Sequence, residues 1–120
     1  MTITSGAPLP SAPASLPDAI ARYIAGANAA DSEAVAASFT PGAVVRDEGK
    51  DWTGRAAIVQ WKEETTRKYR PQTAVTGVES RQGQTLVTAS VSGDFAGSPV
   101  VLTYAFTLKD GLIDRLRIVA

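Results

Sequence analysis

The residues with the clearest chemical potential lie between Phe39 and Trp61. In this stretch a short apolar run, Ala43 to Asp47, ends on a carboxylate and is followed by a polar turn at 48–51. The chain contains no histidine and no cysteine, so any acid–base chemistry must rest on Asp, Glu, Tyr or Lys. A carboxylate at a strand end, with aromatic residues arriving from neighbouring elements, indicates a small-molecule pocket.

Length, charge and motifs narrow the class of protein. A chain of 120 residues fits one domain with a sizeable core, and its 12 basic and 12 acidic residues cancel and are interspersed. We therefore expect no nucleic-acid partner, and no apolar run is long enough to predict a membrane span. Phosphate loops, nucleophile elbows and metal-binding constellations are absent, so we expect no cofactor and no metal. The absence of cysteine and of a secretory pattern agrees with a cytoplasmic location.

Helical patterns come before most of the strand patterns. Residues 1–15 are rich in Pro, Ser, Ala and Gly, which predicts a flexible tail ahead of a folded domain at 16–120. A first helix begins within 15–18, with either Ser15 or the next residue at its cap. Its apolar face, spaced at helical intervals, includes Tyr23.

Two further helices flank the short strand. Asp31 predicts the N-cap of the second helix, which Pro41 and the glycine after it would end. Thr53 predicts the N-cap of a third helix over 54–68. The pattern places Lys62 on the polar face of this third helix, together with its other charged residues.

After the third helix the character of the chain changes. The remaining segments alternate at period two and are joined by short turns, which predicts an antiparallel meander. The predicted strands are Gln72–Arg81, Thr85–Phe95, Val100–Lys109 and Leu112–Val119. Helices gathered on one side of such a sheet predict an α+β fold, with the earlier strand at 43–47 on one edge.

Alternation also assigns the faces of the last two strands. Tyr104 and Phe106 share the larger and more apolar face, which should meet the helices. The same rule turns Asp114 and Leu116 inward and Ile113 outward. Asp114 is then either a second acid in the pocket or the partner of an arginine on a neighbouring strand.

The order of these features resembles the SnoaL-like polyketide cyclases and the ketosteroid isomerases of the nuclear transport factor 2-like superfamily. The resemblance covers about residues 16–119. It rests on the strand that ends in Asp47, the Trp-x-Gly helix start at Trp52, and the Asp-Gly-Leu-Ile turn that begins at Asp110. It implies a cystatin-like cone, in which a curved antiparallel sheet wraps around three N-terminal helices and leaves a central pocket. It also implies a homodimer formed through the outer face of the sheet.

Two segments are similar to ketosteroid isomerase in particular. The run Ala-Arg-Tyr-Ile around Tyr23 resembles the helix that supplies the oxyanion-hole tyrosine of that enzyme, and Val-Arg-Asp at Asp47 resembles the strand that supplies its general base. The protonated Asp of that enzyme falls on Phe106, and Tyr104 on the same face is a partial substitute. The supporting tyrosines of that enzyme fall on Phe39 and Lys62. The Asp–His pair of the cyclase branch has no counterpart, because the chain has no histidine.

These observations lead to two functional hypotheses. The first is a cofactor-independent isomerase- or cyclase-type enzyme for a small hydrophobic carbonyl compound, with Asp47 as general base and Tyr23 as oxyanion donor. The second is a non-catalytic ligand-binding or dimerisation module, in which Asp47 caps its turn or pairs with a nearby arginine and Tyr23 is a core residue. Trp52 would either close the pocket or anchor its turn. The residues expected to contact the ligand are Phe39, Val45, Trp52, Trp61, Tyr104, Phe106, Asp114 and Leu116.

Overall fold

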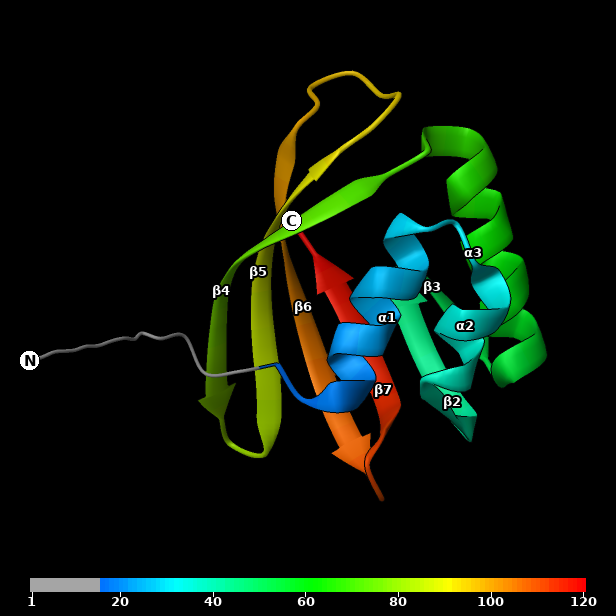
Figure 1. The fold of residues 1–120 in the computed structure, drawn as a ribbon, viewed down its shortest axis with the longest axis vertical. Helices are drawn as coiled ribbons and strands as arrows, with labels where there is room; N and C mark the ends of the chain where they lie inside the picture. The colour runs from blue at the N-terminus through cyan, green and yellow to red at the C-terminus, as the bar shows by residue number, and fades with distance from the viewer. Residues whose placement is uncertain (1–15) are drawn as a thin grey trace, which may run out of the picture.

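The computed structural model describes residues 16–120, so the predicted tail at 1–15 lies outside the described residues. The first helix has Pro17 at its N-cap, so the predicted cap at Ser15 or the next residue is wrong. The described part forms three helices and one six-stranded sheet. The elements are α1 (Asp18–Asn28), α2 (Ser32–Ala37), β2 (Phe39–Asp47), β3 (Lys50–Thr53), α3 (Arg55–Tyr69), β4 (Gln72–Arg81), β5 (Gln84–Ser92), β6 (Val100–Lys109) and β7 (Leu112–Val119). Figure 1 shows the helices on one side of the curved sheet, which confirms the predicted α+β class.

The sheet is mostly an antiparallel meander with one parallel pair. Its strand order is β3-β2-β7-β6-β5-β4, and the pairing of β2 with β7 is the parallel one. Three hairpins turn on a residue followed by glycine, with positive φ at both, as at Asp110 (53°) and Gly111 (79°). Such pairs match the right-handed twist of the strands that they join, which explains why the meander closes with short connections.

The local signals place α2 and the body of α3 well but miss one helix end and one strand. The predicted N-cap of α3 at Thr53 is also wrong, because Gly54 occupies that position and no side chain caps the helix. Asp31 caps α2 as predicted, because its carboxylate accepts a hydrogen bond from the Ala34 amide at 3.1 Å. Pro41 does not end this helix. It lies within β2, where the register with β7 shifts and a missing N–H is tolerated. Lys50–Thr53, predicted mostly as a turn, forms the edge strand β3, so β2 is not at the edge. A short and charged edge strand carries little apolar alternation to reveal it.

A bulge in β7 overturns the predicted faces of that strand. Leu116 pairs with Phe106, but Ile113 pairs with Leu108, so one extra residue of β7 is accommodated between them. Ile113 is consequently fully buried, although simple alternation turned it outward. Asp114 is displaced from the inward face at this irregularity, and its carboxylate accepts a hydrogen bond from Thr40 Oγ1 at 2.7 Å.

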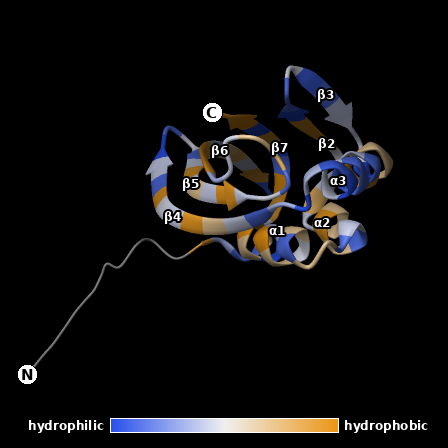
Figure 2. Ribbon diagram, turned by 90° about the horizontal axis from the view of Figure 1, so that it is seen from above, coloured by the Kyte–Doolittle hydropathy of each residue, from blue (hydrophilic) through white to orange (hydrophobic). Residues whose placement is uncertain are grey.

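The core lies between the helices and the concave face of the sheet. Its largest fully buried side chains are Phe39, Phe106, Ile20, Ile58, Ile113 and Leu116. Figure 2 shows hydrophobic and hydrophilic residues alternating along the curled strands, as expected for a sheet with one covered face. No helix within residues 16–120 has the length and apolar character needed to cross a membrane.

Candidate active site

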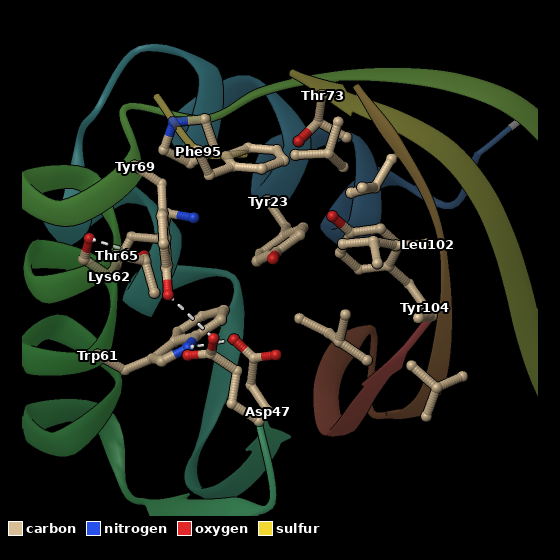
Figure 3. A pocket seen from close by; sticks show the side chains of 17 residues that line it. Tyr23, Asp47, Trp61, Lys62, Thr65, Tyr69, Thr73, Phe95, Leu102 and Tyr104 are labelled. Carbon is tan, nitrogen blue, oxygen red and sulfur yellow. Dashed lines mark hydrogen bonds between the residues drawn. The ribbon is translucent and has the colours of Figure 1, made fainter. Parts of the chain in front are cut away.

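A cavity of about 500 Å³ lies between α1, α3 and the concave face of the sheet. Its walls are mostly aromatic and aliphatic, and its few polar groups come from α1, the end of β2 and the turn after it, α3, β4 and β6. Figure 3 shows Tyr23, Trp61, Tyr69, Phe95 and Tyr104 arranged around this space, with Asp47 at one end. A largely apolar hollow of this size with a few convergent polar groups is the usual form of a small-molecule site.

Asp47 is the more buried of the two acids that line the cavity, the other being Glu48, whose carboxylate accepts a hydrogen bond from Tyr69. Asp47 is the last residue of β2, and its Oδ2 accepts a hydrogen bond from Trp61 Nε1 at 3.0 Å. Burial raises the pKa of the Asp47 carboxyl above its ordinary value, and the hydrogen bond from Trp61 offsets only part of that rise. Neither neighbouring arginine pairs with it, because Arg46 pairs with Asp51 and Arg55 donates to the Phe39 carbonyl.

Tyr23 reaches the same cavity from the middle of α1. Its ring makes edge contacts with three aromatic residues, and the centroid distances are 5.9 Å to Phe39, 6.4 Å to Tyr104 and 5.6 Å to Phe106. Within residues 16–120 no hydrogen-bond partner meets its hydroxyl. Burial, with smaller contributions from Tyr104 and Asp47, raises the pKa of the Tyr23 phenol well above its ordinary value. The phenol therefore stays protonated and remains a hydrogen-bond donor.

Lys62 is the cavity residue that the helical pattern misplaced. It was predicted on the polar face of the third helix, but the structure buries it in the cavity wall with 6% of its surface exposed. Its Nζ lies 5.1 Å from the centroid of the Trp61 ring. Burial lowers the pKa of the Lys62 amine to about 8, against the opposing effect of the Asp47 charge. A signal was present, because Ile58, Lys62, Thr65 and Tyr69 follow one another at helical spacing along a single stripe of α3.

The end of α3 and the loop after β5 build another wall that the sequence did not reveal. The Tyr69 hydroxyl donates to Glu48 Oε2 at 3.0 Å, and the Tyr69 ring meets Phe95 edge-on at 5.9 Å. The loop is held against the helix because the Asp94 amide donates to the Tyr69 carbonyl at 2.7 Å. A Cβ at Gly93 would come within 2.4 Å of that carbonyl oxygen, so only glycine fits there. Phe95, expected within a strand, thus lies in a loop and lines the cavity.

The structure brings some of the predicted ligand contacts together and moves others away. Trp61 and Tyr104 line the cavity with Asp47 and Tyr23. Trp52 instead lines an adjoining hollow of about 220 Å³ that shares Asp47 and Trp61 with the main cavity. The predicted contacts that lie in the core instead of on the cavity wall, each fully buried, are Phe39, Val45, Phe106 and Leu116.

Asp114 also lies away from the cavity, because the bulge in β7 turns it toward Thr40. It is therefore neither a second pocket acid nor, among the described residues, the partner of an arginine. Within the described part of the chain no group of three acidic residues is placed to hold a metal ion. Tyr104 adds a phenol to the cavity wall; burial raises the pKa of that phenol, and a side-chain hydrogen bond with Thr73 opposes the rise. The polar groups best placed for chemistry are thus Asp47, Tyr23, Lys62 and Tyr104.

The burial of Lys62 predicts a stability effect. Its amine, with a pKa of about 8 in the folded protein, is charged at pH 7 and would prefer water. Against the ordinary value of 10.5, this shift is a cost to folding of up to about 3 kcal/mol below pH 8. Between pH 8 and pH 10.5 the amine is neutral in the folded protein but still protonated in the unfolded chain, so the stability rises with pH. Above pH 10.5 the amine is neutral in both states, and the cost has disappeared.

Lys62→Met should therefore increase the free energy of unfolding by about 2–3 kcal/mol at pH 7 and by less than about 1 kcal/mol at pH 10. Urea unfolding of both proteins at the two pH values measures this difference. Lys68→Met, a change at an exposed position of the same helix, should alter stability by less than about 0.5 kcal/mol. Equal stability of wild type and Lys62→Met at pH 7 would contradict the burial of a charged amine.

Comparison with known proteins decides the family. The model of the SnoaL-like domain matches residues 20–116. The chain belongs to the SnoaL-like family. Its resemblance to a candidate polyketide cyclase from Sinorhizobium meliloti is close, with 39% identity over 87% of this chain and 95% of that protein and a TM-score of 0.83. Among proteins of curated function, none matches significantly.

More distant solved structures share the fold of this SnoaL-like chain. A protein from Catenulispora acidiphila with a ketosteroid isomerase-like fold, solved with trimethylamine, is 17% identical over 88% of this chain and 87% of its own length, with a TM-score of 0.78. The epoxide hydrolase/cyclase-like enzyme SalBIII, described in pyran ring formation in the polyether salinomycin, is 21% identical over 84% and 86%, with a TM-score of 0.72. The predicted membership of the nuclear transport factor 2-like superfamily, with its SnoaL-like and ketosteroid isomerase-like fold, is confirmed.

Proposed function

We propose that this SnoaL-like protein is a cofactor-independent proton-transfer enzyme of the isomerase or cyclase type. In this proposal Asp47 removes a proton next to the carbonyl group of a small hydrophobic compound, and Tyr23 donates a hydrogen bond to the oxygen that becomes negative. The observation that carries it is that a partly desolvated carboxylate and a protonated phenol line the same aromatic cavity.

The environment of Asp47 suits a general base. A carboxylate in water is a weak base, and burial moves its pKa toward the working pH, where proton transfer is more efficient. The hydrogen bond from Trp61 Nε1 holds one carboxylate oxygen and restricts rotation of the group. Among the described residues no arginine pairs with it, and burial outweighs the opposing effect of the Lys62 charge on its pKa, so the carboxylate keeps its capacity to accept a proton.

The environment of Tyr23 suits an oxyanion donor. Three aromatic rings hold its own ring in place, so its hydroxyl needs little reorganisation to meet a developing charge. A hydrogen bond to a negative oxygen is stronger in a site that excludes water than in solution. The apolar wall, which includes Val91, Leu102 and Phe95, favours a hydrophobic substrate. The similarity to a candidate polyketide cyclase supports the same class of compound.

Proton exchange tests this function without knowledge of the natural substrate. A panel of cyclic ketones that fit a cavity of about 500 Å³ is incubated with the protein in deuterated water, and deuterium incorporation next to the carbonyl is followed by NMR or mass spectrometry. Wild-type protein should accelerate exchange for at least one ketone. If a ketone binds and raises the unfolding temperature of the protein, but its protons exchange only at the rate seen in buffer, the chain is a binding module.

Tyr23→Phe should lower the rate of this exchange by about 10² to 10³, the usual effect of removing one oxyanion donor. The ring and its aromatic contacts remain, so the fold is kept. Tyr69→Phe is the matched control, because its hydroxyl is already bonded to Glu48, and the loss there should stay below about tenfold. Exchange by Tyr23→Phe at the wild-type rate would exclude the oxyanion role.

A further inference from the structure

We propose that Lys62 is a second reactive group of the cavity, and that its amine condenses with the carbonyl carbon of an apolar aldehyde or ketone to form an iminium. This inference uses the same cavity as the proposed proton transfer but does not require that Asp47 act on a carbon-bound proton. The two proposals can therefore fail separately.

The position of Lys62 is unusual for a lysine. Lysine side chains normally carry their amine into water, and a fully buried lysine is usually paired with an acid. Lys62 is buried on α3, lines the cavity, and forms none of the ion pairs found within residues 16–120. Its Nζ lies near the Trp61 ring, at 5.1 Å from the centroid. The amine is thus held inside an apolar space without a carboxylate bound to it.

The charge state of Lys62 supports a nucleophilic role. Only the neutral amine attacks a carbonyl carbon, and an ordinary surface lysine is almost entirely protonated near neutral pH. Burial lowers the pKa of the Lys62 amine to about 8. At pH 7.5 roughly a quarter of Lys62 is then neutral, more than a hundred times the fraction for an exposed lysine. Schiff-base lysines of enzymes are activated by the same kind of desolvation.

The proton transfers that this condensation requires can be carried out by a group of the same cavity, Asp47. The amine nitrogen bonds to the carbonyl carbon, and one of its protons moves to the oxygen to give a carbinolamine. The Asp47 carboxylate takes the proton that the Lys62 ammonium releases when it becomes the neutral amine, and then delivers this proton to the carbinolamine hydroxyl, which leaves as water. The products are a positively charged iminium, one water molecule and the Asp47 carboxylate. The carboxylate and the face of Trp61 both favour the cation that has formed.

The cavity also limits which carbonyl compounds reach the amine. Polar aldehydes such as sugars would lose hydration against the aliphatic and aromatic wall, with no matching set of hydrogen-bond donors and acceptors. Aromatic or branched aliphatic aldehydes fill the space without this cost. The preferred ligands are therefore apolar aldehydes and unhindered ketones that fit within about 500 Å³.

Reductive trapping tests the inference on the full chain. The protein is incubated at pH 7.5 with low concentrations of benzaldehyde and sodium cyanoborohydride, which converts an iminium into a stable benzylamine. Intact mass and peptide mapping then give the initial rate of modification at each lysine. Lys62 should be modified at least tenfold faster than Lys68, which lies on the same helix near the Tyr69 ring but is exposed.

Variants separate reaction from structure. Lys62→Met should lose the fast adduct, and Lys62→Arg should lose it while keeping the positive charge. Lys68→Met should keep the fast adduct at the wild-type rate. Asp47→Asn should slow its formation by about tenfold, because the proton donor for water loss is gone. Equal modification of Lys62 and Lys68, or an unmodified Lys62 in folded protein, would overturn the proposal. Ketone exchange by wild type in that case would leave the proton-transfer function standing.

Discussion

Asp47→Asn should lower the rate of ketone proton exchange by a factor of about 10² to 10⁴, the range expected when a general base is removed. The amide has the same shape as the carboxylate, and its oxygen can still accept the hydrogen bond from Trp61 Nε1. What it lacks is the ability to take a proton. The loss should appear in the rate of deuterium incorporation at saturating ketone, while ketone binding changes little.

The matched control for this change is Asp51→Asn. Asp51 lies four residues away on β3, is more than half exposed and pairs with Arg46 at 2.8 Å, so its replacement should leave the exchange rate within about twofold of wild type. The wild-type rate should also rise with pH and level off above the pKa of Asp47, because the base must be ionised. Since burial raises that pKa, the rise should occur at a higher pH than for an exposed Asp. A rate unaffected by Asp47→Asn would rule out Asp47 as the base.

Ile113→Ala should reduce the free energy of unfolding by about 2–5 kcal/mol, the usual range for truncating a buried isoleucine. The bulge in β7 turns this side chain into the core, where it is fully buried. Its amide also donates to the Ser38 carbonyl at 2.9 Å, and it pairs with Phe39 across the parallel strands. The cavity left behind would be enclosed on several sides, so the surrounding residues could relax only partly. Urea or thermal unfolding measures the loss.

Val101→Ala on the neighbouring strand is the control for this prediction. Val101 has 63% of its surface exposed, so its truncation should change stability by less than about 0.5 kcal/mol. If β7 alternated without a bulge, Ile113 would lie on the outer face and would behave like Val101. Equal and small effects at the two positions would therefore contradict the bulge.

The candidate site could be predicted only in part from the sequence. Asp47 and Tyr23 followed from short motifs that resemble a known enzyme, and both lie at the cavity together with Trp61 and Tyr104. Their catalytic roles stay predictions. Several expected ligand contacts were misplaced, because alternation tells which face of the sheet a side chain is on. It does not tell whether that side chain lies in the packed core or on the wall of the cavity. Phe106 shares a face with Tyr104 and stacks on it, yet only Tyr104 reaches the cavity.

Lys62 shows the limit of pattern reasoning most clearly. A lysine among other charged residues of a helix is assigned to solvent, since lysine is rarely buried without a partner. Its burial depends on how α3 packs in the fold and on the other segments that complete the cavity around it. These contacts join segments far apart in the chain, so no local window of sequence contains them.

The sequence by itself determined the α+β class, the SnoaL-like family, the cap of α2 and the position of Asp47 at a strand end. These features depend on local periodicity, turn residues and short motifs, which act over a few neighbouring residues. Only the tertiary structure decided that Ile113 is core, that Asp114 is displaced, that Lys50–Thr53 is a strand and that Lys62 is buried. Each of these depends on register and packing between distant segments, which are chosen by the free energy of the whole fold.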